Sequence, residues 1–362
     1  GKVVHESKAG LQDIETQTPI QSDTLYRIFS MTKAITSVAL MTLLEEGLFH
    51  LDDSAEQWIP KLSSLTVYCQ DGKHEPLDKK ITIRHLLTHT AGFSYGFDPD
   101  NNPVDVPYAK IWRGRYQDYN MAELLDLIFE HPLIAQPGTR WHYSIATDIC
   151  GYLIEQMTGK TLAEYFQTCI FEPLGMTDTA FVIDSTKEHR LATLYGQQDE
   201  QSLQVMENPA NSPFIIKPGV KPSRLHSGGA GLISSARDYL RFARMMLNGG
   251  ELDGTRILGR KTVEWMTTNH LHPALLPLSF NGIVPQAMKG YGFGLGYCIN
   301  LDPVETGTLG STGDFGWGGL ADTYCWIDPK EQLIGILMQQ HIPSLFHAGR
   351  RDFRNLVYQA LC

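Results

Sequence analysis

A serine and a lysine three positions apart, Ser30 and Lys33, open the most apolar helical stretch of this 362-residue chain. Side chains three apart on a helix share a face, so the serine hydroxyl and the lysine amine are expected to point into the same space. A lysine in the first turn of a buried helix lies near the positive end of the helix dipole and loses hydration, and both effects favour its neutral form. A neutral amine can take a proton from serine. The pair therefore predicts a covalent serine enzyme, and the alternative is a surface lysine one turn into a helix.

Tyr143 is a candidate partner, because it lies in a predicted loop just ahead of a helix. One lysine charge at about 4 Å is worth about 4 kcal/mol at an effective dielectric near 20. That energy would lower the pKa of a tyrosine from about 10 to about 7, at 1.36 kcal/mol per unit. Tyr143 would then serve as general base for Ser30. Which of Tyr143 and Lys33 holds the proton at rest stays open, because the two groups titrate as a coupled pair. The alternative is a tyrosine that packs the loop.

A tryptophan and two glycines, Trp317, Gly318 and Gly319, precede a predicted strand that begins at Leu320. Since glycine has no Cβ, a ligand can lie close against the backbone there. Backbone amides at this point would join the amide of Ser30 in holding an oxyanion, an interaction whose loss costs about 3 to 4 kcal/mol. The alternative is a glycine-rich turn that lets a sheet bend.

Composition limits the class of protein. Hydrophobic residues at 42% and charged residues at 19% are ordinary globular values and supply a large core. The net charge of −10 argues against nucleic acid or an acidic membrane surface as partner, and no apolar stretch is long enough to span a bilayer. Six cysteines without a CxxC pair favour reduced thiols and a cytoplasmic location over a disulfide framework.

A pair of histidines, His85 and His89, stands four apart on a predicted helix without an acidic residue between them. That spacing occurs in metal sites, but we interpret the pair as core packing and helix-end hydrogen bonds. No metal and no organic cofactor is expected.

Periodicity and capping signals predict the elements that position these residues. Helices are predicted at residues 34–44, 82–92, 121–130, 147–157, 162–170, 236–247 and 346–361. Strands are predicted at residues 3–9, 292–299, 320–327 and 332–338, and the last two form an antiparallel hairpin. Residues 101–119 are expected to form a long loop that walls a pocket.

Strands at both ends with helices between them predict an α+β fold, in which helices flank an antiparallel sheet that carries an inserted, mainly helical lobe. We expect a single domain over residues 1–362, with an α/β part at about 1–50 and 206–362 and the lobe at about 51–205. The active site would lie between the two parts. The first strand lacks a hairpin partner, so we expect further sequence, and with it room for a signal peptide, ahead of Gly1.

Five short segments occur in an order that resembles the serine β-lactamase-related superfamily. They are SMTK at 30–33, LLTHTAG at 86–92, WHYS at 141–144, SGGAGL at 227–232 and WGG at 317–319. More narrowly, the chain resembles the family VIII carboxylesterases, which are esterases built like class C β-lactamases, with penicillin-binding proteins and fungal acyltransferases as relatives. The similarity covers nearly the whole chain and implies a fold of the β-lactamase and penicillin-binding-protein type.

The resemblance also assigns roles. It implies that Ser30 is the acylated nucleophile, Lys33 its proton partner and Tyr143 the general base, and that the amides of Ser30 and Leu320 form the oxyanion hole. The residues that it places around the substrate are Trp317, Gly318, Gly319 and Leu320.

Two departures from the class C pattern bear on the substrate. Ile145 stands where those β-lactamases carry the asparagine of Tyr-x-Asn, and Trp317 with its two glycines stands where they carry Lys-Thr-Gly. Both changes favour uncharged esters, so we expect a serine carboxylesterase for short to medium acyl chains. The expected partner is a small-molecule ester, without nucleic acid or membrane. The alternatives are a β-lactamase or D-alanyl-D-alanine peptidase, an acyltransferase of the same superfamily, and a non-catalytic module that shares the fold.

Overall fold

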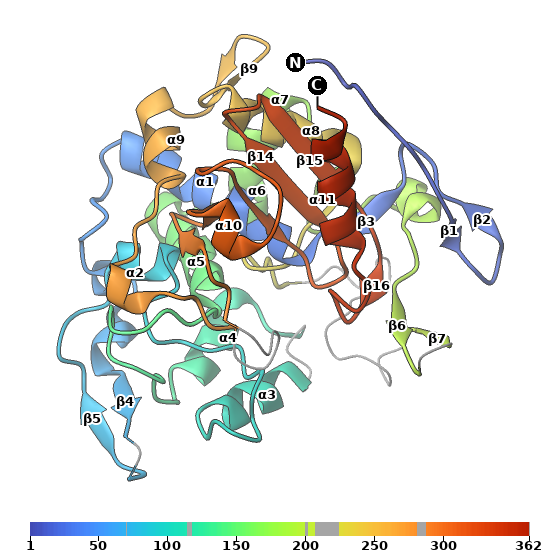
Figure 1. Ribbon diagram of the computed structural model, residues 1–362. Helices are drawn as coiled ribbons and strands as arrows, with labels where there is room; N and C mark the ends of the chain where they lie inside the picture. The colour runs from blue at the N-terminus through green and yellow to red at the C-terminus, as the bar shows by residue number, and fades with distance from the viewer. Residues whose placement is uncertain (70, 114–117, 200–201, 207–223, 281–286, 362) are drawn as a thin grey trace.

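The structure is a computed structural model, and it describes residues 1–69, 71–113, 118–199, 202–206, 224–280 and 287–361 (Figure 1). The α-helices of these residues are α1 (Thr32–Glu45), α2 (Ile83–Leu87), α3 (Asp105–Arg113), α4 (Met121–Ile128), α5 (Ala146–Thr158), α6 (Leu162–Phe166), α7 (Glu172–Leu174), α8 (Ala236–Leu247), α9 (Arg260–Met266), α10 (Pro303–Thr306) and α11 (Gly349–Gln359). Short 3-10 turns lie at η1 (Phe29–Met31), η2 (Ala55–Gln57), η3 (Pro60–Ser64), η6 (Ser185–Arg190) and η7 (Pro273–Leu275), and a π-turn, η5, at Gln167–Phe171.

The main sheet is antiparallel and has the order β11-β12-β13-β14-β15. Its strands are β11 (Tyr291–Phe293), β12 (Cys298–Asn300), β13 (Phe315–Gly318), β14 (Tyr324–Asp328) and β15 (Leu333–Leu337). The other strands form pairs and one small sheet: β1 (Leu11–Asp13) with β2 (Thr18–Pro19), β3 (Leu25–Arg27) with β8 (Ile233–Ser235), β4 (Thr66–Tyr68) with β5 (His74–Pro76), β9 (Glu251–Leu252) with β10 (Thr255–Arg256), and β6 (Tyr195–Gln197) between β7 (Leu203–Val205) and β16 (His341–Ile342).

Helices cover both faces of this sheet. Neighbouring residues on a strand point to opposite faces, so the contacts of successive residues show what covers each face. Trp326 of β14 packs against Phe353 and Tyr358 of α11, which Figure 1 shows lying across β14 and β15. Cys325 and Ile327 belong to the core on the other side, together with residues of α1 and α8. The predicted α+β class, with an antiparallel sheet flanked by helices, is confirmed, and the hairpin β14–β15 turns where it was predicted.

Helix α1 runs through the centre of the molecule with buried residues on nearly every face, as its all-round apolar sequence predicted. Most elements between residues 51 and 205 are helices and 3-10 turns, and Figure 1 shows α2, α3, α4 and the β4–β5 hairpin together beneath the sheet.

The pairing of β3 with β8 brings two distant segments of the chain together. β3 leads directly into the turn that carries Ser30, and β8 follows the glycine-rich segment 227–232. The amide of Ile28 donates to the Leu232 carbonyl at 3.1 Å, and the Thr36 hydroxyl donates to the Gly228 carbonyl at 2.6 Å. The glycine-rich segment therefore lies along the first turns of α1.

Four predicted elements are wrong or misplaced. Residues 3–9 form no strand, and the nearest hairpin is β1–β2. The loop expected at 101–119 contains α3, which begins at Asp105, and residues 114–117 lie outside the described residues. The strand expected at 292–299 is a hairpin, because Gly294 and Gly296 turn the chain against α9 and α1. Leu320 lies in the turn before β14 and not in the strand, so Trp317 and Gly318 end β13.

Candidate active site

Ser30 lies in the 3-10 turn η1, two residues ahead of the first residue of the buried helix α1. The residue before it, Phe29, has a φ of +43°, a conformation that costs energy for a residue with a Cβ. Phe29 is held there by packing against Leu194 and Ala321. This turn presents the Ser30 hydroxyl at the start of the helix, 3.4 Å from the amine of Lys33.

Lys33 is fully buried, with 1% of its surface exposed. Its amine donates to the Gly229 carbonyl at 2.8 Å and to the Tyr95 hydroxyl at 3.0 Å. Burial lowers the pKa of Lys33 to about 7, and the nearby Asp148 carboxylate acts in the opposite direction. A substantial fraction of this amine is therefore neutral near pH 7, which agrees with the expectation for a lysine at this position of a buried helix.

A network of buried groups orients the lysine from behind. The Tyr95 hydroxyl, which accepts from Lys33, donates to Asp148 Oδ2 at 2.9 Å. The other oxygen of Asp148 accepts from the Ser227 hydroxyl at 2.5 Å and from the Gly229 amide at 3.0 Å. A Cβ on Gly229 would lie 2.2 Å from Asp148 Oδ2, so only glycine fits there. Burial and the Asp148 charge raise the pKa of Tyr95 well above its usual value, and its phenol stays protonated.

Sequence reasoning missed Tyr95 and gave Asp148 no role. Tyr95 lies in an irregular segment and has no local pattern that marks it. Asp148 had a weak signal, since a carboxylate buried in the first turn of the apolar helix α5 needs partners. The glycine-rich segment 227–232 was noted only as part of a resemblance, and in the structure it supplies a carbonyl, an amide and a hydroxyl to the lysine network.

Tyr143 lies within hydrogen-bonding reach of the Ser30 hydroxyl. It lies in the loop before α5, as predicted, and the Lys33 amine stands 4.6 Å from the centre of its ring. The Trp317 indole donates to the Tyr143 hydroxyl at 3.2 Å. Burial raises the pKa of Tyr143, while hydrogen bonds with Ser30 and Trp317 act to lower it. The structure thus brings Ser30, Lys33, Tyr143 and Trp317 together.

The phenol pKa near 7 inferred from the sequence is wrong. That argument counted one lysine charge and left out burial, which in the structure outweighs the hydrogen bonds to Tyr143. The same burial lowers the pKa of Lys33 and so weakens the charge that was meant to act on the phenol. The amine, more than the phenol, is therefore the group poised to accept a proton near neutral pH.

The segment 317–320 ends next to the nucleophile turn. A Cβ on Gly319 would lie 2.4 Å from the Ile28 carbonyl oxygen, and the Thr323 hydroxyl donates to that same oxygen at 3.2 Å. Leu320 packs beside Phe29. Its amide has no hydrogen-bond partner within the described part of the chain, whereas the Gly319 amide is used by the Thr323 carbonyl at 2.7 Å. A backbone donor without an acceptor next to the turn that carries Ser30 is suited to an oxyanion hole.

The two histidines have structural contacts. His85 accepts the Thr82 amide at 3.2 Å as part of the cap of α2, and this helix-end bond was predicted. His89 is buried against the Tyr143 ring, with ring centres 4.7 Å apart, and its Nδ1 accepts the Ser144 amide at 3.3 Å. Burial lowers the pKa of His89 well below its usual value, so the ring beneath Tyr143 is neutral. Within the described residues, no group of three or more His, Cys, Asp or Glu side chains could hold a metal ion.

Aromatic side chains wall the site. Phe280 packs at a tilt against Tyr143 with ring centres 4.7 Å apart, and the ring centre of Trp317 lies 5.3 Å from that of Tyr143 and 5.7 Å from that of Phe280. Trp141 and Phe293 belong to the same cluster. The ring of Tyr143 is therefore surrounded mainly by apolar side chains.

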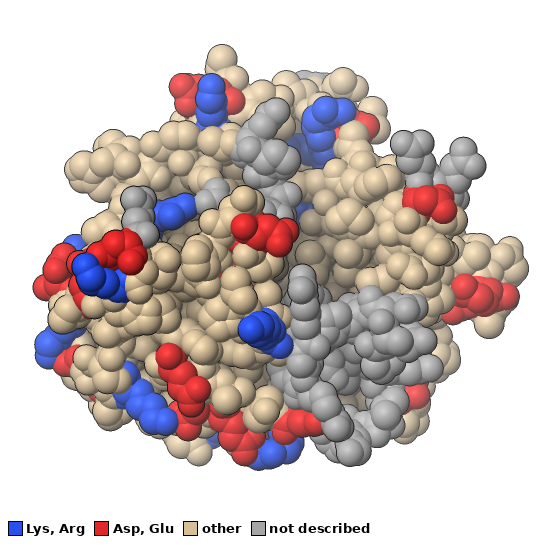
Figure 2. Space-filling model, turned by 90° about the horizontal axis from the view of Figure 1, so that it is seen from below, with Lys and Arg blue, Asp and Glu red and all other residues tan. Residues whose placement is uncertain are grey.

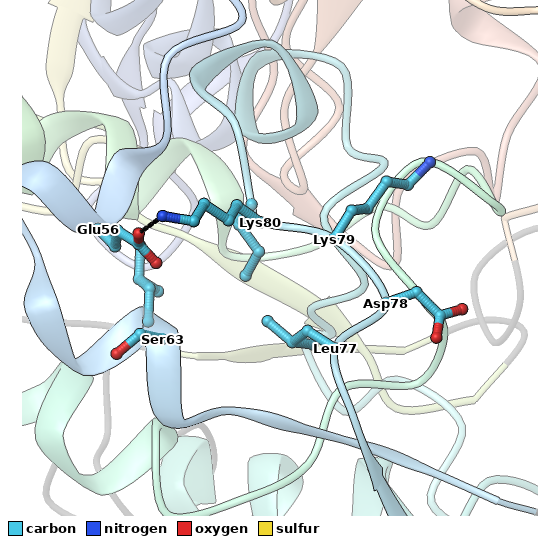
Figure 3. A pocket seen from close by; sticks show the side chains of 8 residues that line it. Glu56, Ser63, Leu77, Asp78, Lys79 and Lys80 are labelled. Carbon is cyan, nitrogen blue, oxygen red and sulfur yellow. Dashed lines mark hydrogen bonds and ion pairs between the residues drawn. The ribbon is translucent and has the colours of Figure 1, made fainter.

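The pocket in Figure 3 has a volume of about 410 Å³ and is lined by eight residues, and the Lys80–Glu56 ion pair lies on its wall. None of these eight residues is Ser30, Lys33, Tyr143 or Trp317. On the face in Figure 2, acidic and basic side chains are interspersed between uncharged areas. None of the described helices is long and apolar enough to cross a bilayer.

Comparisons with known proteins bear on the family and the fold of the chain. The Beta-lactamase family model matches residues 1–359. Protein Rv1367c of Mycobacterium tuberculosis is 36% identical over 95% of this chain and 84% of its own length. A lovastatin esterase of Penicillium rubens is 32% identical over 94% of this chain and 86% of its own. A solved structure described as EstCE1, a hydrolase with promiscuous acyltransferase activity, has a TM-score of 0.78 and 25% identity, and covers 96% of this chain and 88% of its own. The resemblance stated from the sequence motifs is confirmed.

Proposed function

Since this chain belongs to the Beta-lactamase family, we propose that it is a serine carboxylesterase that cleaves esters of short to medium acyl chains through an acyl-serine intermediate. The superfamily comprises serine hydrolases and acyltransferases with this fold, and several relatives are named as esterases. The single observation that carries the proposal is the convergence of Ser30, Lys33 and Tyr143 from two segments of the chain more than 100 residues apart.

The chemistry follows from the contacts. Ser30 attacks the ester carbonyl, and its proton passes to the pair of Lys33 and Tyr143, in which the buried amine is neutral near pH 7. The amides of Ser30 and Leu320 hold the oxyanion. The ester C–O bond then breaks, the pair returns the proton to the leaving alkoxide, and an acyl-serine remains. Water activated by the same pair cleaves the acyl-serine and restores the hydroxyl.

In this mechanism Tyr95 and Asp148 are positioning residues. They hold the amine toward Ser30 through contacts of 3.0 and 2.9 Å, and the Asp148 charge keeps the pKa of Lys33 from falling further. The amine therefore returns to the protonated form easily enough to serve as the acid for the leaving group.

The site favours esters over β-lactams. Ile145, buried at 1% exposure, offers no amide to a β-lactam side chain. The Trp317 indole donates a hydrogen bond to Tyr143, and its ring packs at a tilt against Phe280 and Tyr143, where a β-lactamase-like motif would present a lysine to a carboxylate. A neutral, apolar acyl or alcohol group suits these contacts better than a charged one.

Acyl transfer is a second candidate function, because EstCE1 is described as a hydrolase with promiscuous acyltransferase activity. An alcohol that reaches the acyl-serine in place of water would give a transfer product by the same steps. Product analysis with p-nitrophenyl butyrate and added ethanol distinguishes the two activities, because transfer gives ethyl butyrate and hydrolysis gives butyrate.

The test compares p-nitrophenyl butyrate with nitrocefin under identical conditions, followed by a series of p-nitrophenyl esters of increasing chain length. We expect turnover of the butyrate ester at least about a hundredfold faster than that of nitrocefin, which corresponds to about 3 kcal/mol in the activation barrier. Faster turnover of nitrocefin would overturn the proposal. Ser37→Ala, in the same helix but facing Gly296, is the control variant for unrelated loss of a buried hydroxyl.

A further inference from the structure

An arginine of α11, Arg350, lies behind the segment that carries the Leu320 amide. Its Nη2 donates to the Gly319 carbonyl oxygen at 2.5 Å. Its Nε forms an ion pair with Asp322 Oδ1 at 2.8 Å, and the two side chains are 15% and 4% exposed. The guanidinium is thus held, largely out of solvent, against one particular peptide unit.

The Gly319 carbonyl and the Leu320 amide belong to that same peptide unit. In a planar trans peptide the C=O and N–H bonds point in opposite directions. A donor that binds the carbonyl from behind therefore fixes the direction of the amide in front. It also polarises the unit, because hydrogen bonds in series strengthen one another, and a charged donor does so more than a neutral one.

We propose that Arg350 is a positioning residue of the oxyanion hole, which acts through the Gly319–Leu320 peptide unit to orient the Leu320 amide and strengthen it as a donor. This inference rests on the proposed function, since it assumes that an oxyanion forms beside Ser30. It assigns to α11 a catalytic task in addition to covering the sheet.

The backbone around Arg350 is built for this contact. A Cβ on Gly318 would lie 2.3 Å from Arg350 Nη1, so the glycine lets the guanidinium pack directly on the chain. Asp322, which pairs with Arg350, has a φ of +63° and closes the turn by donating its amide to the same Gly319 carbonyl at 3.2 Å. Its carboxylate also accepts the Leu345 amide at 3.1 Å, which fixes the ion pair from the other side.

The competing explanation is that Arg350 only anchors α11 to the sheet. Arg354, one turn further along the same helix, provides the comparison. It is buried, forms an ion pair with Asp314 at 2.6 Å and donates to the Leu309 carbonyl at 2.7 Å. Arg354 anchors α11 without bonding the Gly319–Leu320 unit, so the matched variants Arg350→Met and Arg354→Met separate the two roles.

The experiment measures kcat and KM for p-nitrophenyl butyrate, the inhibition constant of n-butylboronic acid, and the melting temperature of each variant. The tetrahedral boronate on Ser30 would place an oxygen in the oxyanion hole, whereas KM reports mainly ground-state binding. For Arg350→Met we expect kcat to fall roughly tenfold to a hundredfold, less than for loss of a whole oxyanion donor, with KM changed by less than about twofold. The inhibition constant of n-butylboronic acid should rise by a similar factor.

Three further variants separate the charge, the shape and the anchoring role of the Arg350 guanidinium. Arg350→Lys retains the charge and should recover part of kcat, although it loses the planar fork of the guanidinium. Arg354→Met should lower the melting temperature and leave the kcat of the folded enzyme close to that of the wild type. Should Arg350→Met not fold, Asp322→Asn, which leaves Arg350 in place but loosens it, is expected to lower kcat and boronate affinity together.

Equal losses of kcat in Arg350→Met and Arg354→Met, or an unchanged boronate constant in Arg350→Met, would overturn the inference. Failure of the proposed function is distinguishable from this result. If the wild type does not hydrolyse the ester, the rate of labelling by a fluorophosphonate, which also develops charge in the hole, still compares the two arginine variants.

Discussion

Replacement of Asp148 by asparagine tests which group accepts the proton of Ser30. Asp148 Oδ2 and Lys33 Nζ are bridged by the Tyr95 hydroxyl through contacts of 2.9 and 3.0 Å, which place the carboxylate no more than about 6 Å from the amine. A unit charge at about 6 Å and an effective dielectric near 20 is worth about 3 kcal/mol, or about two pKa units. Asparagine keeps the size and most hydrogen-bonding capacity of the side chain but removes this charge.

The sign follows from the direction of each effect. Burial lowers the pKa of Lys33 to about 7 and the Asp148 charge raises it, so Asp148→Asn removes the raising effect. The expected pKa of Lys33 in the variant is about 5. Only the neutral amine accepts a proton, so kcat/KM rises with pH as Lys33 deprotonates. The acid limb of the profile should therefore move from near pH 7 to near pH 5, even if the maximal rate falls.

The assay is hydrolysis of p-nitrophenyl butyrate from pH 4 to 9, followed at an isosbestic wavelength of the product. Asp238→Asn is the matched control, because Asp238 is a buried carboxylate of α8 that bonds the Asp178 amide and the Thr179 hydroxyl, away from Lys33. Its acid limb should coincide with that of the wild type. An acid limb in Asp148→Asn that stays in place or moves to higher pH would refute the assignment of the limb to Lys33.

Two further predictions concern the backbone around the site. Gly296→Ala should lower the free energy of unfolding by about 2 to 4 kcal/mol in denaturant unfolding, because φ is +89° and the new Cβ would lie 2.0 Å from Ser37 Oγ. Gly254→Ala is the control, since Gly254 has a φ of +81° but no neighbour within 4 Å, and it should cost only about 1 to 2 kcal/mol. Equal losses in the two variants would contradict the packing argument. Thr323→Val removes the 3.2 Å hydrogen bond to the Ile28 carbonyl, so it should lower the free energy of unfolding by about 1 kcal/mol and change kcat more than KM. An unchanged kcat would show that this bond does not align the amides of Ser30 and Leu320.

Local signals located several elements correctly. The serine cap and the glycine stop of residues 236–247 predicted α8 with its observed bounds, and Ser235 does accept the Asp238 amide. The loop position of Tyr143 and the buried helix behind Ser30 were also predicted, because each depends on residues close in the sequence.

What the sequence could not predict depends on tertiary contacts. Tyr95 and Asp148 are 53 residues apart, and their bond exists because the segment that carries Tyr95 lies against the start of α5, where the Ile145 amide donates to the Ser94 carbonyl at 3.4 Å. The strand expected at 292–299 breaks because Gly296, with a φ of +89°, lies against Ser37 of α1, a residue more than 250 positions away in the sequence. The direction of the Tyr143 pKa shift needed the burial of its ring, which a count of nearby charges omits.

The central claim is that Ser30 is the nucleophile, and intact-mass analysis after a fluorophosphonate probe tests it most directly. The account predicts one adduct per chain in the wild type, located by peptide mapping at Ser30, and no adduct in Ser30→Ala with an unchanged melting temperature. Labelling of Ser30→Ala at the wild-type rate, or an adduct mapped to another residue of the wild type, would contradict it.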